Sequence, residues 1–268
     1  MSMLGEHRGA LARDLEQVFG HGTATALPEG QLLRRFVAER DESAFSTLVS
    51  RHGPMVMGVC RRVLGTRPDA EDAFQATFLV LLRRANALQA ADSLGPWLYG
   101  VAWRVASRAR AGNARRRLEE ENAAATRPEQ TESDCSAARR ELHAIIDEEI
   151  NRLPEKYRQP LVLCYLEGLT QEAAARKLGW KSGVLRGRLD RARLRLRGQL
   201  ARRGLAPAAT LAIADWLHSS AQAAVAQALV HATVHTACRE LTVSKVSGTV
   251  AATSAATQIG RASCRERV

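Results

Sequence analysis

The sequence predicts an all-α protein with two small helical domains joined by a flexible linker and followed by an Ala-rich helical tail. Apolar residues recur at helical spacing along most of the chain, and few stretches show the period of two that indicates a strand. Aromatic residues make up only 4% of the 268 residues and alanine is abundant, a composition that suits small helical bundles. The predicted boundaries are residues 28–117 for the first domain, 118–137 for the linker, 138–204 for the second domain and 205–258 for the tail.

The chain is strongly basic, with a formal net charge of +11 and an isoelectric point near 10.3. Such a charge favours a nucleic-acid partner, although a membrane surface could also attract it. The five cysteines lie far apart with no CxxC pair, which argues against a disulfide framework or a zinc ribbon and fits reduced thiols in a cytoplasm. The N-terminal residues lack a signal pattern, and no apolar run approaches the ~18 residues of a membrane span.

The first domain is expected to begin with a helix opened by Pro28, because proline is well tolerated in a first helical turn. A long helix over residues 41–64 follows, with a bend expected at Gly53-Pro54, where proline removes a backbone donor. A third helix begins at Asp69–Asp72, since the helix dipole favours acidic residues in a first turn. Its buried stripe consists of Phe74, Phe78, Leu81 and Leu82.

A second face of this third helix mixes polar and apolar side chains. A mixed face of this kind suits a protein partner, and an ordinary solvent-facing surface is an equal alternative. The candidate protein-binding residues on this face are Asp69, Asp72, Gln75 and Leu79.

Residues 86–95 show no periodicity and are expected to form a loop, after which Pro96 opens a helix with an aromatic start and a basic end. Residues 104–117 include six basic residues and no acidic one. Such a helix can bind unpaired bases and their phosphates. The alternative is that its aromatic end packs in the core and its basic end is simply exposed to solvent. Trp97 is assigned to the core. The candidate residues for binding melted nucleic acid are Asn86, Leu88, Trp103, Arg104 and Arg108.

The second domain follows an acidic stretch that is rich in Ala, Thr and Ser. Its first helix has the apolar residues Ile146 and Ile150, and Leu153-Pro154 separates this helix from the next. The acidic run Asp147-Glu148-Glu149 could suggest a metal or general-acid site. No histidine or further carboxylate converges on the run, so it is interpreted as a solvated helix face.

Residues 168–200 predict a helix-turn-helix. Thr170 is a good N-cap for a short helix, and Gly179 can supply the left-handed turn that ends it. Ser182 is expected to cap the second helix. The buried stripe of that helix consists of Leu185, Leu189, Ala192 and Leu196.

Basic residues separate the members of this buried stripe. Residues 176–203 contain eleven basic residues and one acidic residue, Asp190, so the net charge of this segment is +10. The net charge of the whole chain is +11. The positive excess therefore lies almost entirely here, as expected for a phosphate-binding surface, whereas a solvated face would mix Glu with Lys. The candidate residues for binding duplex DNA are Lys181, Ser182, Arg186, Arg188 and Arg191.

The two units together, over about residues 32–200, resemble bacterial sigma factors of the extracytoplasmic-function (ECF) type in the sigma-70 family. The first unit resembles sigma region 2 and the second resembles sigma region 4. The amino-acid sequence of these segments and the long Ala-rich tail are most similar to those of sigma factors from planctomycete-like bacteria. The segments that carry the resemblance are Asp41 to Phe45, Asp69 to Gln75, Pro96 to Tyr99, Leu153 to Arg158 and Gly168 to Arg193.

The resemblance implies a function for each segment. The helix from Asp69 would dock on core RNA polymerase, the 86–95 loop would capture a flipped base of melted promoter DNA, and the helix from Ser182 would read an upstream element in the major groove. An anti-sigma factor is a further candidate partner. Val184 and Gly187 stand where the family usually has hydroxyl side chains, and Ala76 stands where it often has glutamate.

The sequence contains no nucleophile–base pair, Gly-rich phosphate loop or metal cluster, so we expect no enzyme activity, no cofactor and no small-molecule substrate. One alternative function is that of a helix-turn-helix repressor or activator that acts without polymerase. Such a protein would have no use for the 69–79 face or for the aromatic-basic helix over 97–117. A membrane-tethered signalling adaptor is a third class.

The tail is expected to form one or two amphipathic helices. His231, His235 and Cys238 have a spacing that could hold a metal, but three such residues more often pack. Residues 259–268 resemble the translation of a sequencing adapter and are excluded from the fold. Whether the natural chain continues past Gln258 into a membrane or sensor segment stays open.

Overall fold

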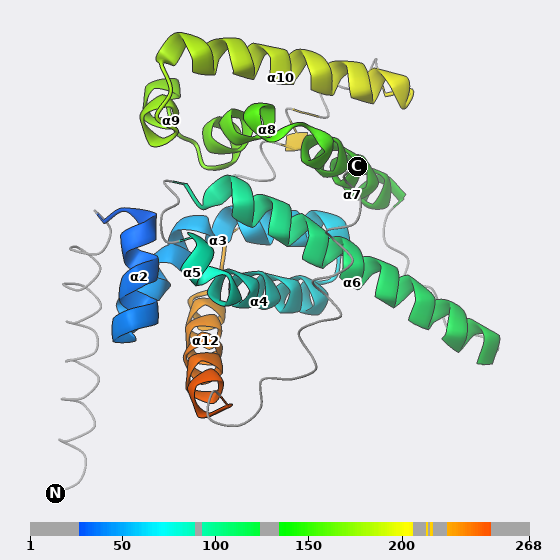
Figure 1. Ribbon diagram of the computed structural model, residues 1–268. Helices are drawn as coiled ribbons and strands as arrows, with labels where there is room; N and C mark the ends of the chain where they lie inside the picture. The colour runs from blue at the N-terminus through cyan, green and yellow to red at the C-terminus, as the bar shows by residue number, and fades with distance from the viewer. Residues whose placement is uncertain are drawn as a thin grey trace, which may run out of the picture.

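The computed structural model describes residues 27–88, 93–123, 134–205, 213, 215, 216 and 224–247, and its regular elements are all helical (Figure 1). The all-α prediction is therefore confirmed for these residues, while the N-terminal tail and residues 259–268 lie outside them. The helices are α2 (Glu29–Glu39), α3 (Glu42–Leu64), α4 (Arg67–Arg83), α5 (Ala85–Leu88), α6 (Gly95–Ala123), α7 (Asp134–Arg152), α8 (Glu155–Leu161), the π-helix η1 (Val162–Leu166), α9 (Gln171–Lys177), α10 (Ser182–Arg202) and α12 (Gln227–Ser247).

Helix α3 is the centre of the first domain, where α2, α4 and α6 pack against it (Figure 1). Asp41 caps its start, because the Asp41 carboxylate accepts a hydrogen bond from the backbone N–H of Ala44 at 3.1 Å. In the core, Phe36 of α2 stacks on Phe45 of α3 with ring centroids 4.3 Å apart. Phe78, a member of the predicted stripe of α4, meets Phe45 edge-on at 6.3 Å, so the apolar faces of all three helices meet in one core.

Two segments that were predicted to be irregular are partly helical. Residues 85–88, at the start of the predicted 86–95 loop, form the short helix α5. Helix α6 continues to Ala123, beyond the expected start of the linker at residue 118, because its last turns consist largely of the good helix formers Arg, Leu and Glu. Helix α7 begins at Asp134, inside the segment expected to be linker.

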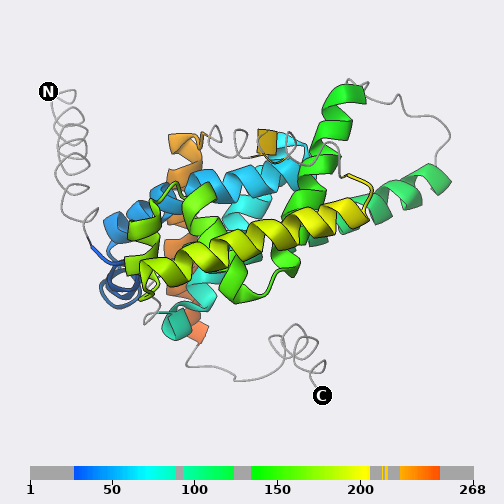
Figure 2. The ribbon, with the colours of Figure 1, turned by 90° about the horizontal axis from the view of Figure 1, so that it is seen from above.

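The two domains pack against each other, a contact that the sequence did not predict. Helix α7 of the second domain lies against α3 and α6, and η1 lies against α6 (Figures 1 and 2). Ile146, Ile150 and Leu153 are buried in the same apolar cluster as the core of the first domain. Burial of the apolar face of α7 therefore joins the two domains.

Helix α12 of the tail packs across α3 and α4 of the first domain (Figure 1). Its buried side chains face this surface, as a predicted amphipathic helix requires. None of the helices in the described part of the chain combines the length and the apolar character needed to cross a membrane. The buried side chains of α12 are Leu229, Val230, Thr233, Val234 and Ala237.

Candidate nucleic-acid and protein-binding surfaces

Helices α9 and α10 form the predicted helix-turn-helix. The Thr170 hydroxyl accepts a hydrogen bond from the backbone N–H of Ala173 at 3.2 Å, which confirms the predicted cap of α9. Gly179 has a φ of 63°, the left-handed conformation that glycine adopts without strain. The predicted stripe of α10 is buried from Leu185 to Leu196, so the opposite face of this helix points outward.

The start of α10 differs in detail from the prediction. Ser182 is the first residue of the helix, and Lys181 occupies the N-cap position without a side-chain cap. The backbone explains the difference, because Lys181 has the extended conformation of a capping residue, with φ −68° and ψ 142°. The Ser182 side chain is exposed and is therefore accessible to a ligand.

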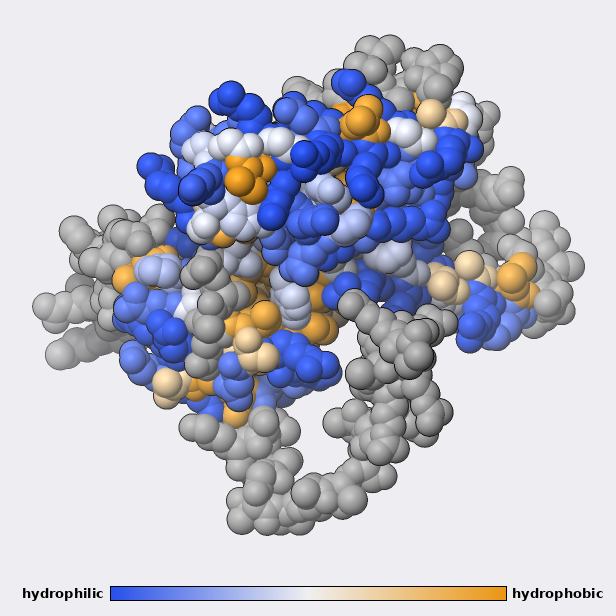
Figure 3. All heavy atoms as spheres, turned by 45° about the horizontal axis from the view of Figure 1, so that its top comes forward, coloured by the Kyte–Doolittle hydropathy of each residue, from blue (hydrophilic) through white to orange (hydrophobic). Residues whose placement is uncertain are grey.

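The outward face of α10 is exposed along its length. Lys181, Arg186 and Arg191 all lie on this face and are exposed. Figure 1 shows α10 along one edge of the molecule, and Figure 3 shows that this side is mostly hydrophilic with a few separate apolar patches. A positive, accessible helix face of this kind fits the major groove of duplex DNA.

Arg188 lies differently from the other candidate residues of α10. Its guanidinium carbon lies 3.9 Å from the ring centroid of Trp180, in the turn before the helix, and the side chain is half-buried. Sequence reasoning did not single out Trp180, although an aromatic residue in the turn of a helix-turn-helix was a visible signal. Arg193 is held within the domain, because it donates hydrogen bonds to the Tyr165 hydroxyl at 2.6 Å and to Asp190 at 3.0 Å.

The candidate residues for melted DNA lie on α5 and α6. Asn86, Arg104 and Arg108 are exposed, whereas Leu88 and Trp103 are half-buried and pack at the edge of the core. Trp97 also packs partly against the core, in agreement with the structural role assigned to it. Residues 89–92 of the predicted loop lie outside the described residues.

A third arginine joins this surface from the other domain. Arg104 is exposed as a whole residue, but partial desolvation of its guanidinium lowers its pKa, and the neighbouring cations of Arg158 and Arg108 lower the pKa further. Arg158 belongs to α8 and donates one hydrogen bond to the backbone carbonyl of Asn151 at 3.1 Å. Three positive groups that repel one another would gain from a phosphate between them.

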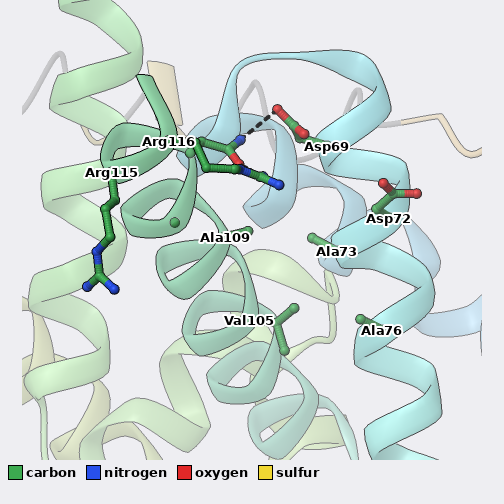
Figure 4. Close-up of a pocket in the computed structure, with 10 residues that line it drawn as sticks. Asp69, Asp72, Ala73, Ala76, Val105, Ala109, Arg115 and Arg116 are labelled. Atoms are coloured by element: carbon green, nitrogen blue, oxygen red, sulfur yellow. Dashed lines mark hydrogen bonds between the residues drawn. The ribbon is translucent and has the colours of Figure 1, made fainter. Parts of the chain in front are cut away.

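The candidate protein-binding face of α4 borders a groove between α4 and α6 (Figure 4). Asp72 is exposed at its rim, and Asp69 is held in place by hydrogen bonds from Thr66 at 2.6 Å and Asn113 at 3.0 Å. Gln75 and Leu79 are half-buried on the same helix. The groove is lined by the small residues Ala73, Ala76, Ala109 and Gly112, and Arg115 and Arg116 of α6 also border it.

The acidic run at residues 147–149 was interpreted wrongly from the sequence. Asp147 and Glu149 are buried, and only Glu148 is half-exposed. Asp147 binds Arg62 of the first domain through two hydrogen bonds, of 2.7 and 3.1 Å. A signal was available that the interpretation did not use: Asp147 is three residues before the apolar Ile150, one helical turn away, so a helix that buries Ile150 would also turn Asp147 inward.

The possible metal ligands of the tail do not converge. His231 and His235 are exposed on α12 and Cys238 is half-buried. Within the described residues no group of three histidine, cysteine or acidic side chains could hold a metal ion. The surface of α12 that faces α3 and α4 is largely apolar, so this helix packs against the first domain, as in the alternative to metal binding considered above.

Comparisons with known proteins match both domains. A family model described as Sigma-70 region 2 matches residues 48–116, and a model described as Sigma-70, region 4 matches residues 143–196.

Curated relatives extend the same likeness over most of both domains. The RNA polymerase sigma factor CarQ of Myxococcus xanthus is 31% identical over 160 residues, which cover 58% of this chain and 88% of that protein. The ECF RNA polymerase sigma factor SigE of Mycolicibacterium smegmatis is 32% identical over 177 residues, which cover 62% of this chain and 66% of that protein. A solved structure of CnrH with the cytosolic domain of CnrY is 23% identical, with a TM-score of 0.35 over 65% of this chain and 98% of that one.

Proposed function

The chain belongs to the ECF-type sigma factors of the sigma-70 family and is an alternative sigma factor for transcription initiation, and we propose that its surfaces divide the work as follows. The α10 face binds an upstream promoter element as duplex, the α5–α6 surface binds the melted element, and the α4–α6 groove binds core RNA polymerase. The observation that carries this division is the separation of two basic surfaces on different domains, one on α10 and one on α6.

Duplex reading is assigned to the exposed side chains of α10. Arg186 and Arg191 can each pair with a guanine edge or clamp a phosphate, and Lys181 and Ser182 lie where the helix start would approach the backbone. The stacking of Arg188 on Trp180 supports a fixed direction for that guanidinium, so it would approach DNA with little further loss of side-chain freedom.

Binding of the melted element is assigned to Asn86, Leu88, Trp103, Arg104 and Arg108. Two exposed arginines near a half-buried tryptophan offer phosphate contacts and an aromatic face for bases. Desolvation and then repulsion from Arg158 and Arg108 lower the Arg104 pKa; a bound phosphate would offset the repulsion, which supports this assignment.

Docking on core polymerase is assigned to Asp69, Asp72, Gln75 and Leu79. The groove beside them is lined by small residues, which let a partner helix approach closely, and by acidic and basic side chains on opposite sides, Asp72 on α4 and Arg115 and Arg116 on α6, which suit a partner that carries both charges. A repressor that acts without polymerase would need no such groove, which favours the sigma-factor function over that alternative.

The remaining assignments follow from this function. We place the protein in the cytoplasm with the polymerase, and we assign it no catalytic reaction of its own. An anti-sigma factor remains a candidate partner, and the likeness to planctomycete-like sigma factors remains a prediction.

Run-off transcription with core polymerase on a promoter library tests the proposal. Transcripts that depend on the added protein, from promoters that share an upstream and a melted element, are the expected result. Duplex binding without any protein-dependent transcript would favour a repressor.

A further inference from the structure

Arg104, Arg108 and Arg158 form an arginine cluster beside the domain junction. Arg104 and Arg108 lie one turn apart on α6 of the first domain, and Arg158 lies on α8 of the second. Arg158 donates a hydrogen bond to the backbone carbonyl of Asn151 at 3.1 Å. A Cβ added at Gly100 of α6 would lie 3.4 Å from Nη1 of Arg104 and 3.6 Å from Oδ1 of Asn151. The side chains of Arg104 and Arg158 therefore reach the same place from different domains.

The arginine cluster has no acidic partner in the part of the chain that the structure describes. Other arginines at the junction are paired. Arg203 binds Glu148 of α7 at 2.9 Å, and Arg62 binds the buried Asp147 at 2.7 Å. The described acids of this region are thus used by other arginines, and the three charges of the cluster repel one another without a counter-charge.

One arginine of the cluster has a buried donor without an acceptor. The Nε–H of Arg158 is buried and has no hydrogen-bond partner among the described residues, although the side chain as a whole is only half-buried. Most buried donors in folded proteins have an acceptor, so an unpaired one is consistent with an ion that binds there. An oxyanion fits, because Nε and Nη2 lie on one edge of a guanidinium and can donate to two oxygens together.

The surroundings of Arg104 favour an anion with two charges. Partial desolvation lowers the pKa of its guanidinium, and the cations of Arg158 and Arg108 lower the pKa further. An anion between the three groups would offset this repulsion. A phosphate group carries about two negative charges at neutral pH and offers three acceptor oxygens. It therefore matches three guanidinium groups better than a carboxylate, which has one charge and two oxygens.

We propose that the arginine cluster binds a free phosphate group, as inorganic phosphate or a phosphate monoester, and that the complete site exists only while the two domains are packed. Two of its arginines come from the first domain and one from the second, so neither domain contains the whole site. Arg158 is not among the residues assigned to melted DNA, and the site therefore goes beyond the proposed function. A ligand that binds only the packed form stabilises that form by mass action.

A bound phosphate would also occupy two residues assigned to the melted strand. Arg104 and Arg108 are exposed in the packed form, so a DNA strand or a free anion can reach them. The two ligands share the chemistry of the phosphate group but differ in their need for Arg158 of the second domain. Competition between them rests on the proposed function, whereas binding of the free anion does not.

Calorimetric titration of the full chain with inorganic phosphate, at constant ionic strength and without other oxyanions, tests the site. Arg158→Gln removes the charge and keeps an amide N–H that can donate to the Asn151 carbonyl. Arg108→Gln changes an exposed side chain, where folding is not at risk. Arg202→Gln, at the exposed end of α10, is the matched control because it removes the same charge outside the cluster. Circular dichroism confirms that helicity is unchanged.

The native chain is expected to bind phosphate at a saturable site, and each cluster variant to bind it about tenfold or more weakly. Phosphate should raise the melting temperature of the native chain and of Arg202→Gln, with little effect on the two cluster variants. Absence of saturable binding would overturn the site. Native-like binding by Arg158→Gln would do the same, because the anion would then lie on α6 alone. Equal weakening by Arg202→Gln would also overturn it, because binding would then depend only on net charge.

A labelled single-stranded oligonucleotide distinguishes the two sources of phosphate. Inorganic phosphate is expected to displace it from the native chain at constant ionic strength, and to displace it poorly from Arg158→Gln. If Arg158→Gln weakened oligonucleotide binding while the native chain bound no inorganic phosphate, the cluster would belong to the DNA backbone and the free-phosphate site would be refuted. If no oligonucleotide bound at all, the assignment of melted DNA to α5 and α6 would fail, and the phosphate titration would still decide the site.

Discussion

The carboxylate of Glu167 in the second domain lies 3.0 Å from Nδ1 of His52, a fully buried histidine at the middle of α3 in the first domain. On the other side of the ring, Nε2 lies 3.4 Å from the carboxylate of Glu29. Burial disfavours the charged imidazolium, but the hydrogen bond to Glu167 and the negative charges of Glu167 and Glu29 outweigh this effect and raise the pKa of His52 to about 9. A charged histidine between two carboxylates therefore joins the domains.

This pair predicts a loss of stability in mild alkali. A raised folded-state pKa stabilises the protein fully below the unfolded value of about 6.5, and the contribution disappears as pH rises through about 9. Glu29 does not contribute to this slope: burial raises its pKa, but His52, Lys177 and the Leu94 N–H outweigh burial and hold it well below its usual range, so Glu29 is ionised throughout. Melting temperatures from pH 6 to pH 10 should fall more steeply for the native chain than for His52→Gln. Parallel curves would contradict the assignment.

Removing Arg62 should destabilise the protein strongly. Arg62→Ala would leave the Asp147 carboxylate buried without its cation, which typically costs ~3–5 kcal/mol. Urea denaturation would measure the loss. Arg67→Ala is the matched control, since its pairing with Glu71 is largely exposed and solvent screens such a pair, so that its loss should change stability little. Similar losses in the two variants would mean that the buried pair is no more important than a surface pair.

The helices and the helix-turn-helix were predictable because their signals are local. Thr170, Gly179 and the α10 stripe lie within a few turns of one another, and capping and periodicity act over that distance. The junction at Asp147 was not predicted, since its partners Arg62 and Trp216 are 85 and 69 residues away along the chain. No local pattern links residues at such separations, and an acidic run most often marks a solvated face.

The proposed polymerase-docking face can be tested by charge reversal. Asp72 is exposed at the rim of the α4–α6 groove, so Asp72→Arg should weaken binding to core polymerase by ~1–3 kcal/mol through like-charge contact and lost hydrogen bonds. Helicity should not change. Glu39→Arg makes the same charge change at an exposed site on α2 and should bind normally. Titration of labelled polymerase measures both affinities, and equal binding by the native chain and Asp72→Arg would remove this face from the interface.

The division of DNA binding between α10 and the α5–α6 surface predicts two separable defects. Arg191 is exposed on the duplex-reading face, so Arg191→Ala should weaken upstream duplex binding by ~1–3 kcal/mol and spare a premelted template once polymerase is loaded. Arg104→Ala should leave upstream binding intact and reduce promoter opening, because opening costs a few kcal/mol per unstacked step that contacts to the freed strand must offset. A bubble template removes that cost and should rescue Arg104→Ala.

Footprinting and permanganate reactivity on matched duplex and bubble promoters separate these two steps. Arg197→Ala, on an exposed part of α10 beyond the candidate contacts, serves as the control for general loss of charge. Equal defects in Arg191→Ala and Arg197→Ala would indicate non-specific attraction to phosphate, because a specific contact depends on position whereas screened charge attraction does not. The role in melting would be refuted if Arg104→Ala opened the duplex normally, or if a bubble template failed to rescue its defect in opening. The basic residues of α6 would then only keep the end of the helix solvated.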